Sequence, residues 1–378
     1  MIVPNGYPLK GDLTLDLCRN CAFVSNSTSS TEPDYIEYYK TLNKHQNRDD
    51  AHSKIDIEYF SKLISYILEN SNFKFLNSKV LDFGSGSLIF SDLAKIAGAT
   101  TVGNYDIGAS NNIDSDYDLI LSTHTFEHLV DPKQSFAKLV KILKPGGSIV
   151  VAVPDFSTYE NAYYGPYAHF DLEHINHFSL SSLSALFESY DMEILSVRQS
   201  ERRVSPTLSY SEILVIGMKN SKILKKVSPT PNFSAEEKMN SLINRYEIDF
   251  AKTIDAFKEI LMGVNQQEKV ILSIYGLSSQ AFRLLSALQD LNMLSEIDFY
   301  GDSDSRLTQF SLGDKPIMDK ESFYLAAEEF VNNGFKVYVL VYAINSYRII
   351  EMFQKELSPE GLKVIALPPD SQNRRNSY

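Results

Sequence analysis

The stretch from Lys79 to Pro154 constrains the fold of this chain more than any other part of the sequence. It begins with an apolar run that enters an aspartate and a Gly-x-Gly turn, Val80-Leu81-Asp82-Phe83-Gly84-Ser85-Gly86-Ser87-Leu88. Such a turn is typical of a buried parallel strand that passes into a helix where the backbone must approach a ligand closely. We therefore expect a small-molecule cofactor to lie over residues 84–86.

Three further apolar runs follow within the same stretch. Residues 101–105 are followed by Asp106, 24 positions after Asp82. An acid at the tip of this next strand could accept hydrogen bonds from two ribose hydroxyls. Residues 117–122 lead into a polar cluster at 123–128, and the last run follows the turn Lys144-Pro145-Gly146-Gly147. This order of strand, glycine turn, strand, acid, strand and polar cluster predicts an α/β fold.

At these residues the chain resembles the class I S-adenosylmethionine-dependent methyltransferases. Four motifs in register carry the resemblance: Asp82-Phe83-Gly84-Ser85-Gly86, Asp106, the segment from Phe126 to Pro132, and Lys144-Pro145-Gly146-Gly147. One departure is Leu88, which follows Ser87 where a third small residue is usual. The resemblance implies a Rossmann-like sheet that ends in an antiparallel hairpin at residues 192–197 and 212–218, with S-adenosyl-L-methionine as cofactor.

The same resemblance implies a set of cofactor-binding residues. Asp114 belongs to it because the family often contacts the adenine just before the third strand, although a solvated loop acid is an equal alternative. Asp118 is expected to be a buried structural residue at the start of that strand. The expected cofactor-binding residues are Asp82, Gly84, Ser85, Gly86, Asp106, Asp114, Thr123, His124 and Glu127.

Composition narrows the location and the partners of the protein. The 378 residues carry a formal charge of −12, from 48 acids against 36 bases, which repels phosphate backbones and argues against nucleic-acid binding. No apolar segment approaches the roughly 20 residues that span a bilayer, and the N-terminus lacks a signal-peptide pattern. We therefore expect a cytoplasmic protein without a membrane span.

Residues 1–55 form an N-terminal extension that is not expected to have a core of its own. Its most specific feature is Cys18-Arg19-Asn20-Cys21, because a Cys-x-x-Cys turn supplies half of a tetrahedral zinc site. No second cysteine pair follows, and His45 and His52 fit no common zinc spacing. The pair is a partial zinc knuckle or two reduced thiols, and we expect no metal.

Five of the seven histidines lie between residues 124 and 177, and three of these five follow the last strand of the stretch. Here the resemblance narrows to sugar C-methyltransferases and surface-polysaccharide methyltransferases, through Glu173-His174, His177-Phe178-Ser179 and a helix from Ser182 to Ser189 capped by Ser179 or Ser181. It implies a nucleotide-linked sugar or another glycan precursor as methyl acceptor. The candidate catalytic residues are His174, Glu173, His177 and His128.

Methyl transfer to a sugar carbon or hydroxyl requires removal of a proton from a weak acid, and histidine titrates nearest to neutral pH. We expect His174 to be the general base, oriented by Glu173 or Glu127 through its other ring nitrogen. For any single histidine, a hydrogen-bonded place in the core or in a loop is an equal alternative. The cluster as a whole favours function because titratable groups concentrate at active sites.

The pattern divides the remaining chain into a linker and a second α/β unit. We expect a methyltransferase domain at 56–219, a linker and helix at 220–262 and a C-terminal Rossmann-like domain at 263–378, with strands at 270–276, 297–300, 337–342 and 364–367 and helices at 279–292 and 346–357. Gly276 is one glycine where a phosphate-binding turn needs three. This domain either forms the substrate side of a cleft or serves packing and homodimer formation.

Two alternatives to the sugar-directed enzyme stay open. One is a binding or scaffold protein that has kept the methyltransferase fold without activity, which Leu88 and the half zinc site favour. The other is a methyltransferase of a small metabolite or a protein, which would share the cofactor site and differ only in its acceptor.

Overall fold

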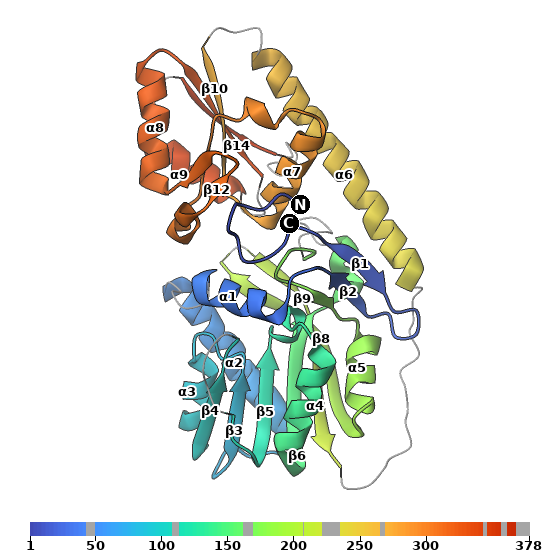
Figure 1. The fold of residues 1–378 in the computed structure, drawn as a ribbon. Helices are drawn as coiled ribbons and strands as arrows, with labels where there is room; N and C mark the ends of the chain where they lie inside the picture. Colours follow the sequence, from blue (N-terminus) through green and yellow to red (C-terminus); the bar gives the residue numbers. More distant parts are fainter. Residues whose placement is uncertain are drawn as a thin grey trace.

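The computed structural model describes residues 1–42, 50–107, 113–161, 169–206, 208–220, 235–264, 269–342, 346–356 and 361–367. In these ranges the chain forms two six-stranded sheets and one three-stranded sheet. Figure 1 shows one large sheet in the lower half of the molecule and the other in the upper half, with the long helix α6 (Ala235–Val264) beside the upper one. Helices flank both large sheets, which confirms the predicted α/β class with a second C-terminal sheet.

The lower sheet contains the Gly-x-Gly turn. Its strands are β3 (Lys79–Phe83), β4 (Thr101–Tyr105), β5 (Tyr117–Thr123), β6 (Leu143–Pro154), β8 (Met192–Ser205) and β9 (Leu208–Lys219). Their order is β4-β3-β5-β6-β9-β8. The strands from β4 to β6 run parallel, and β9 and β8 complete the sheet as an antiparallel hairpin, as predicted. Both hairpin strands are longer than their apolar runs suggest.

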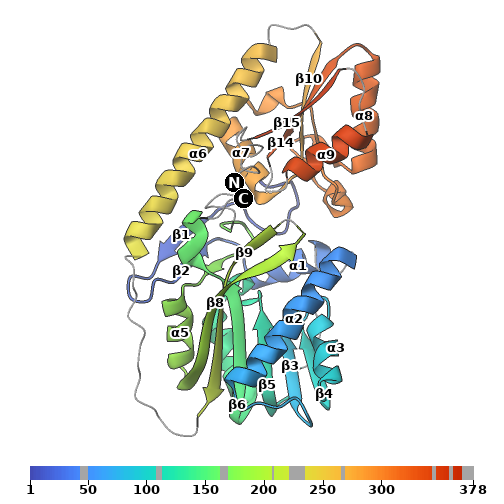
Figure 2. The same ribbon diagram turned by 180° about the vertical axis from the view of Figure 1, so that it is seen from behind.

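Helices cover the two faces of this sheet because its buried strand residues alternate between them. Phe60 of α2 and Phe90 of α3 pack on one face, which Figure 2 shows from the front. Phe136 of α4 and Phe187 of α5 pack on the other face, with ring centroids 4.7 Å apart. The bounds are α2 (Asp50–Asn70), α3 (Ile89–Ile96), α4 (Pro132–Ile142) and α5 (Leu180–Glu188).

Side-chain caps mark the beginnings of two of these helices. Ser179 caps α5 in a capping box with Ser182, so the first of the two predicted caps is the one used. Asp131 caps α4 by accepting a hydrogen bond from the backbone of Gln134, and Pro132 opens the helix. Both helices therefore begin where local chemistry predicts.

The N-terminal segment joins the lower half through a small sheet. Strands β1 (Thr14–Leu17) and β2 (Val24–Ser27) form a hairpin, and β2 also pairs with β7 (Asn176–His177). Helix α1 (Glu32–Leu42) follows. Cys18 and Cys21 lie in the turn of the hairpin as free thiols. The extension thus packs directly onto residues 169–177, which contain three histidines and are called the histidine-rich segment below.

The upper sheet has the order β12-β13-β11-β10-β14-β15, and its strands are parallel except at β12. The hairpin β12–β13 and helix α8 were not predicted. Within the linker and helix predicted at 220–262, the linker part at residues 222–233 lies outside the described residues. The elements are β10 (Val270–Tyr275), α7 (Ser279–Asp290), η3 (Leu294–Glu296), β11 (Phe299–Gly301), η4 (Ser305–Gln309), β12 (Ser311–Leu312), β13 (Lys315–Met318), α8 (Lys320–Asn332), β14 (Lys336–Val341), α9 (Ser346–Glu356) and β15 (Leu362–Ala366).

One hydrophobic core connects the upper sheet to the active-site half. It contains Tyr35 and Tyr38 of α1, Leu172 of the histidine-rich segment, and Leu277 and Leu307 of the upper half. Leu277 lies two residues after the end of β10 and belongs to the same core as Leu172. The carboxyl end of this strand therefore faces the histidine-rich segment. Apolar burial on this scale stabilises the contact between the two halves.

The turn after β3 depends on the absence of a side chain at Gly84. Its φ is +90°, and a Cβ built there would lie 1.8 Å from Oγ1 of Thr125. The backbone N–H groups of Gly84 and Ser85 both donate to the carbonyl of Tyr105, at 2.7 and 3.0 Å. The turn is thereby fastened to the end of β4.

We expect Gly84→Ala to lower the free energy of unfolding by about 2–4 kcal/mol, through backbone strain together with the clash against Thr125. Gly146→Ala is the matched control, because Gly146 has a φ of +79° and open space around it. It should cost only about 1 kcal/mol. Urea unfolding of both variants tests this, and equal losses would contradict the role of crowding at Gly84.

Candidate active site

A cavity opens at the carboxyl ends of β3, β4 and β5, where the Gly-x-Gly turn meets Asp106. It brings together seven of the predicted site residues: Gly84, Ser85, Gly86, Asp106, Thr123, His124 and His128. It is also lined by residues outside the predicted set: Tyr39, Asp56, Phe60, Ser87, Ile107, Thr125 and Arg202. Parallel strands bring their carboxyl ends to one edge, which explains why motifs distant in sequence meet there.

The Gly-x-Gly turn presents its backbone to this cavity. Gly86 has a φ of +43° and Leu88 a φ of +61°. The left-handed conformation at Leu88 is one that glycine adopts without strain, and it costs a leucine about 1 kcal/mol. Leu88 precedes α3 and is exposed, so its side chain leaves the turn open.

Asp106 stands at the end of β4, opposite the turn. Its Oδ1 accepts a hydrogen bond from the backbone of Ile107 at 2.9 Å. Burial raises its pKa, while that hydrogen bond and His128 oppose the rise. Ile107 also lines a neighbouring cavity of about 670 Å³, along with Phe83 and Tyr105, whose rings stack at 4.7 Å. A carboxylate beside a cavity that is partly lined by aromatic rings could hold a ribose and a flat base.

Asp82 has a different place from the one predicted. It is buried beneath the turn, is not among the residues that line the cavity, and accepts a hydrogen bond from Ser91 of α3 at 2.9 Å. Burial raises the pKa of Asp82 to about 7, and the nearby Asp106 carboxylate adds to the rise. Its observed contact is structural, because it ties β3 to the helix that follows the turn.

Asp114 is not brought to the cavity, so the prediction of an adenine contact is not supported. Its exposed carboxylate forms an ion pair with Lys79, the first residue of β3. Gly84 follows the last residue of that strand, so Asp114 lies toward the opposite edge of the sheet. Asp118 is partly exposed rather than buried, and it accepts hydrogen bonds from Lys144 and from the backbone of Lys79.

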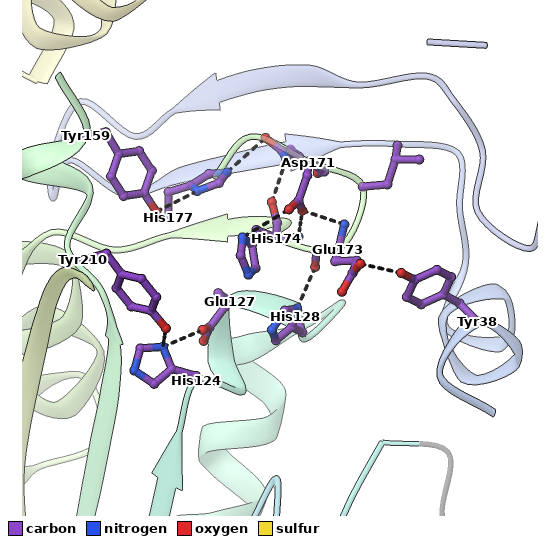
Figure 3. Close-up of polar contacts among 12 residues, drawn as sticks. Tyr38, His124, Glu127, His128, Tyr159, Asp171, Glu173, His174, His177 and Tyr210 are labelled. Atoms are coloured by element: carbon purple, nitrogen blue, oxygen red, sulfur yellow. Dashed lines mark hydrogen bonds and ion pairs between the residues drawn. The ribbon is translucent and has the colours of Figure 1, made fainter. Parts of the chain in front are cut away.

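His124 lies between two buried carboxylates, those of Glu127 and Glu212, and Figure 3 shows the first of them beside it. Its Nδ1 is 3.2 Å from Oε1 of Glu127 and 3.1 Å from the hydroxyl of Tyr210. Its Nε2 lies 2.9 Å from Oε2 of Glu212. Burial raises the pKa of Glu212 and of Glu127, and the neighbouring cations oppose both rises. Two buried carboxyl groups therefore face the two nitrogens of one ring.

The histidine-rich segment is fastened onto the short helix η1 (Phe126–His128) by three hydrogen bonds. The backbone N–H of Ile175 donates to the carbonyl of Glu127 at 2.8 Å. The side-chain amide of Asn176 donates to the carbonyls of Phe126 and Leu129, at 3.0 and 2.6 Å. These bonds hold the preceding residue, His174, against η1.

His128 and His174 consequently lie side by side, with ring centroids 4.7 Å apart. Nδ1 of His128 donates to the carbonyl of Glu173 at 3.0 Å, which leaves its Nε2 as the basic nitrogen of the neutral ring. Nδ1 of His174 lies 3.5 Å from Oδ2 of Asp171. Figure 3 shows Glu127, His128 and His174 grouped at the centre of the site.

The partner of His174 differs from the prediction. Asp171 faces its ring, whereas the carboxylate of Glu173 accepts a hydrogen bond from the hydroxyl of Tyr38. Glu173 acts on the pair only through its backbone carbonyl, which binds His128. Asp171 was not predicted, although its position three residues before His174 was a usable signal. An aspartate there can hold the turn, and Oδ1 of Asp171 does accept hydrogen bonds from the backbone N–H groups of Glu173 and His174.

His177 is fully buried in β7, and it is not among the residues that line the cavity. Its ring lies 3.3 Å from the hydroxyl of Tyr159 and 3.3 Å from Oδ1 of Asn26. Burial lowers its pKa well below the usual value, and it also lowers the pKa of His169 to about 3. His177 therefore stays neutral and connects β2 to the segment, which corrects its predicted catalytic place.

Metal binding is chemically possible at one group among the described residues. Glu127, His128 and His174 each offer a ligand atom, and these atoms lie within 4.8 Å of one another. Two histidines and a carboxylate are a common zinc or iron ligand set. At the N-terminal turn, backbone hydrogen bonds lower the pKa of Cys18, and burial raises that of Cys21.

Residues 55–197 match the protein family described as a methyltransferase domain. The matched range contains the Gly-x-Gly turn, Asp106, η1 and the histidine-rich segment. The fold and this match define a methyltransferase domain of the class I type. The chain accordingly contains a methyltransferase domain at residues 55–197.

Solved structures are similar to a part of this chain. One is an S-adenosylmethionine-dependent methyltransferase from Mesorhizobium loti, with 13% identity, a TM-score of 0.33, and coverage of 40% of this chain and 96% of that one. Another is magnesium protoporphyrin IX methyltransferase from Synechocystis PCC 6803, with 10% identity, a TM-score of 0.36, and coverage of 51% and 100%. No curated protein gives a significant match.

Each helix in the described part of the chain is too short or too polar to cross a bilayer.

We expect the pH dependence of the free energy of unfolding to reveal the raised pKa of Asp82, the buried acid beneath the turn. Because the folded pKa of Asp82 is about 7 against an ordinary 3.8, the folded state retains a proton that the unfolded chain releases. Its contribution therefore falls as the pH rises from about 4 to about 7. Relative to the wild type, Asp82→Asn should gain stability over that interval and then level off, in urea unfolding without cofactor. A constant difference between the two proteins would contradict the raised pKa.

Asp106→Ala should weaken S-adenosylhomocysteine binding about 10- to 100-fold, because it removes charge-assisted hydrogen bonds. Asp114→Ala is the control, since that carboxylate pairs with Lys79 toward the other edge of the sheet. It should leave the affinity unchanged. Titration calorimetry measures both, and an equal loss in the two variants would remove Asp106 from the ribose site.

Proposed function

We propose that this enzyme transfers a methyl group to a carbon or an oxygen of a nucleotide-linked sugar or another glycan precursor, with His174 as general base. One observation carries the proposal. The cavity that contains the Gly-x-Gly turn and Asp106 is also lined by His128, whose ring contacts that of His174. The residues suited to hold the donor thus adjoin the residues suited to remove a proton.

The residues present fit S-adenosylmethionine. The two glycines of the turn at 84–86 leave its backbone open, Asp106 offers acceptors for two hydroxyls, and the rings of Phe83 and Tyr105 in the neighbouring cavity suit a purine. When bound, the donor supplies an electrophilic methyl group on a sulfonium. The protein contributes alignment of that group with the acceptor, which accounts for much of the rate enhancement in such transfers.

The proton of the acceptor would pass to Nε2 of His174. With Asp171 at 3.5 Å from Nδ1, the proton on that nitrogen faces a carboxylate, and Nε2 is the basic atom. The carboxylate then stabilises the imidazolium that forms. Buried Glu127 adds negative charge nearby and favours the same protonated state.

The surroundings of this base support a polar, polyhydroxylated acceptor. Tyr38 and Glu173, the residue before His174, form a hydroxyl–carboxylate pair, and Tyr39, whose ring contacts that of Tyr38, lines the cavity. Such groups suit sugar hydroxyls and the apolar faces of sugar rings.

The upper sheet supports a nucleotide portion on the acceptor. The carboxyl ends of β10 and β11 lie against the core that includes Leu172, and ligands of open α/β sheets bind at such ends. Arg306 lies there as well. Its hydrogen bond with Asp304 raises its pKa most, and Tyr38 and Glu173 add to the rise.

Incubation of the enzyme with labelled S-adenosylmethionine and a panel of nucleotide sugars, followed by mass spectrometry, tests the acceptor. The expected result is a mass gain of one methylene on at least one nucleotide sugar. Methylation only of small metabolites or proteins would replace the acceptor class. Cofactor binding without any transfer would favour a scaffold role instead.

His174→Ala should lower kcat by about 10²- to 10⁴-fold and leave S-adenosylhomocysteine affinity unchanged, because the base acts only on the acceptor. Added imidazole should recover part of the rate. Asp171→Asn should lower kcat by a smaller factor, since it removes only the partner of the base.

Activity after dialysis against EDTA separates a base from a metal ligand at this position. Under the proposal the activity is retained. A loss that zinc or iron restores would show that Glu127, His128 and His174 hold an ion, and would replace the general-base role of His174.

A further inference from the structure

Arg202 on β8 is a buried cation whose donors are incompletely used. Its side chain is 8% exposed, and among the described residues neither Nε nor Nη1 has a hydrogen-bond partner. Its Nη2 lies 3.9 Å from Oδ1 of Asp56, and its guanidinium stacks 4.2 Å from the ring centroid of Tyr59. Buried N–H groups without acceptors cost free energy, so a ligand acceptor is expected.

Arg202, with its unused N–H groups, lines the cavity at the Gly-x-Gly turn. Arg202 and Asp56 line it together with Gly84, Ser85, Gly86 and Ser87. Asp56 comes from α2 and Arg202 from β8, so neither belongs to the Gly-x-Gly motif. Glu212, the other acid close to Arg202, already contacts His124, Tyr59 and Arg198.

We propose that Arg202 and Asp56 bind the amino-acid end of S-adenosylmethionine, with the guanidinium on its α-carboxylate and the aspartate on its α-ammonium. This assignment rests on the placement of the cofactor in the cavity described above. If Asp106 takes the ribose, the methionyl portion extends along the Gly-x-Gly turn, where both charged side chains lie. Arg202 supplies paired N–H groups, which suit a carboxylate.

Charge complementarity favours this ligand over a phosphate of the acceptor. One arginine beside one aspartate matches a zwitterion, which carries one charge of each sign. A phosphate dianion would meet the same arginine but would be repelled by Asp56, which is 2% exposed and therefore poorly screened by solvent.

A cycle of protein and ligand changes tests the proposal by titration calorimetry. The ligands are S-adenosylmethionine, decarboxylated S-adenosylmethionine and 5′-methylthioadenosine, which lacks the amino-acid end. Wild type should bind the first at least about 10-fold more tightly than the second. In Arg202→Met that difference should vanish, because the affinity for S-adenosylmethionine alone falls, by about 10- to 100-fold.

Two further variants sharpen the result. Asp56→Asn should weaken both ligands that carry the ammonium and leave 5′-methylthioadenosine unaffected. Arg203→Met is the matched control, because the exposed Arg203 donates to the carbonyls of Ser205 and Pro206, away from the cavity. It should change none of the affinities.

Equal weakening of all three ligands in Arg202→Met would assign Arg202 a structural role and overturn the proposal, as would no change at all. If Arg202→Met fails to fold, Arg202→Lys replaces it in the same titrations. The wild-type protein alone is also a test, because equal affinity for S-adenosylmethionine and its decarboxylated form would contradict the proposal. Because no acceptor is used, the outcome is independent of the methylated substrate. Failure of all three ligands to bind would instead remove the cofactor placement.

Discussion

The active site depends on the hydrogen bonds that fasten the histidine-rich segment onto η1. Ile175 donates from its backbone to Glu127, and Asn176 donates from its side chain to Phe126 and Leu129. These bonds join a segment beyond the sixth strand to the loop after the fifth, and they place His174 beside His128. Without them His174 would not lie beside His128 and the cavity that this residue lines.

Buried charge is the second constraint, and it is balanced by pairing. Glu212 and Glu127 flank His124, while Arg198 and Arg202 lie against Glu212 and Asp56. Burial of either sign alone would be costly in a medium of low dielectric constant. The pairing lets the sheet end in a polar site without losing the core beneath it, and it leaves donors of Arg202 available to a ligand.

The sequence predicted the parts of the site that local backbone chemistry specifies. The Gly-x-Gly turn, the acid after β4, the terminal hairpin and the cap of α5 were all found, because each depends on residues close together in the chain. The errors have the opposite origin. Asp114, His177 and the partner of His174 were misplaced because spacing alone does not tell toward which edge, or into which core, a side chain turns.

Sequence by itself therefore determined the class of fold, the Gly-x-Gly turn and the acid at the end of β4, since each of these is specified by a short stretch of neighbouring residues. Only the tertiary structure decided which histidines meet, that Asp171 faces His174, and that Asp56 and Arg202 reach the same cavity from α2 and β8. The physical reason is that contacts between distant elements are set by packing of helices and strands across the sheet. No local pattern records that packing.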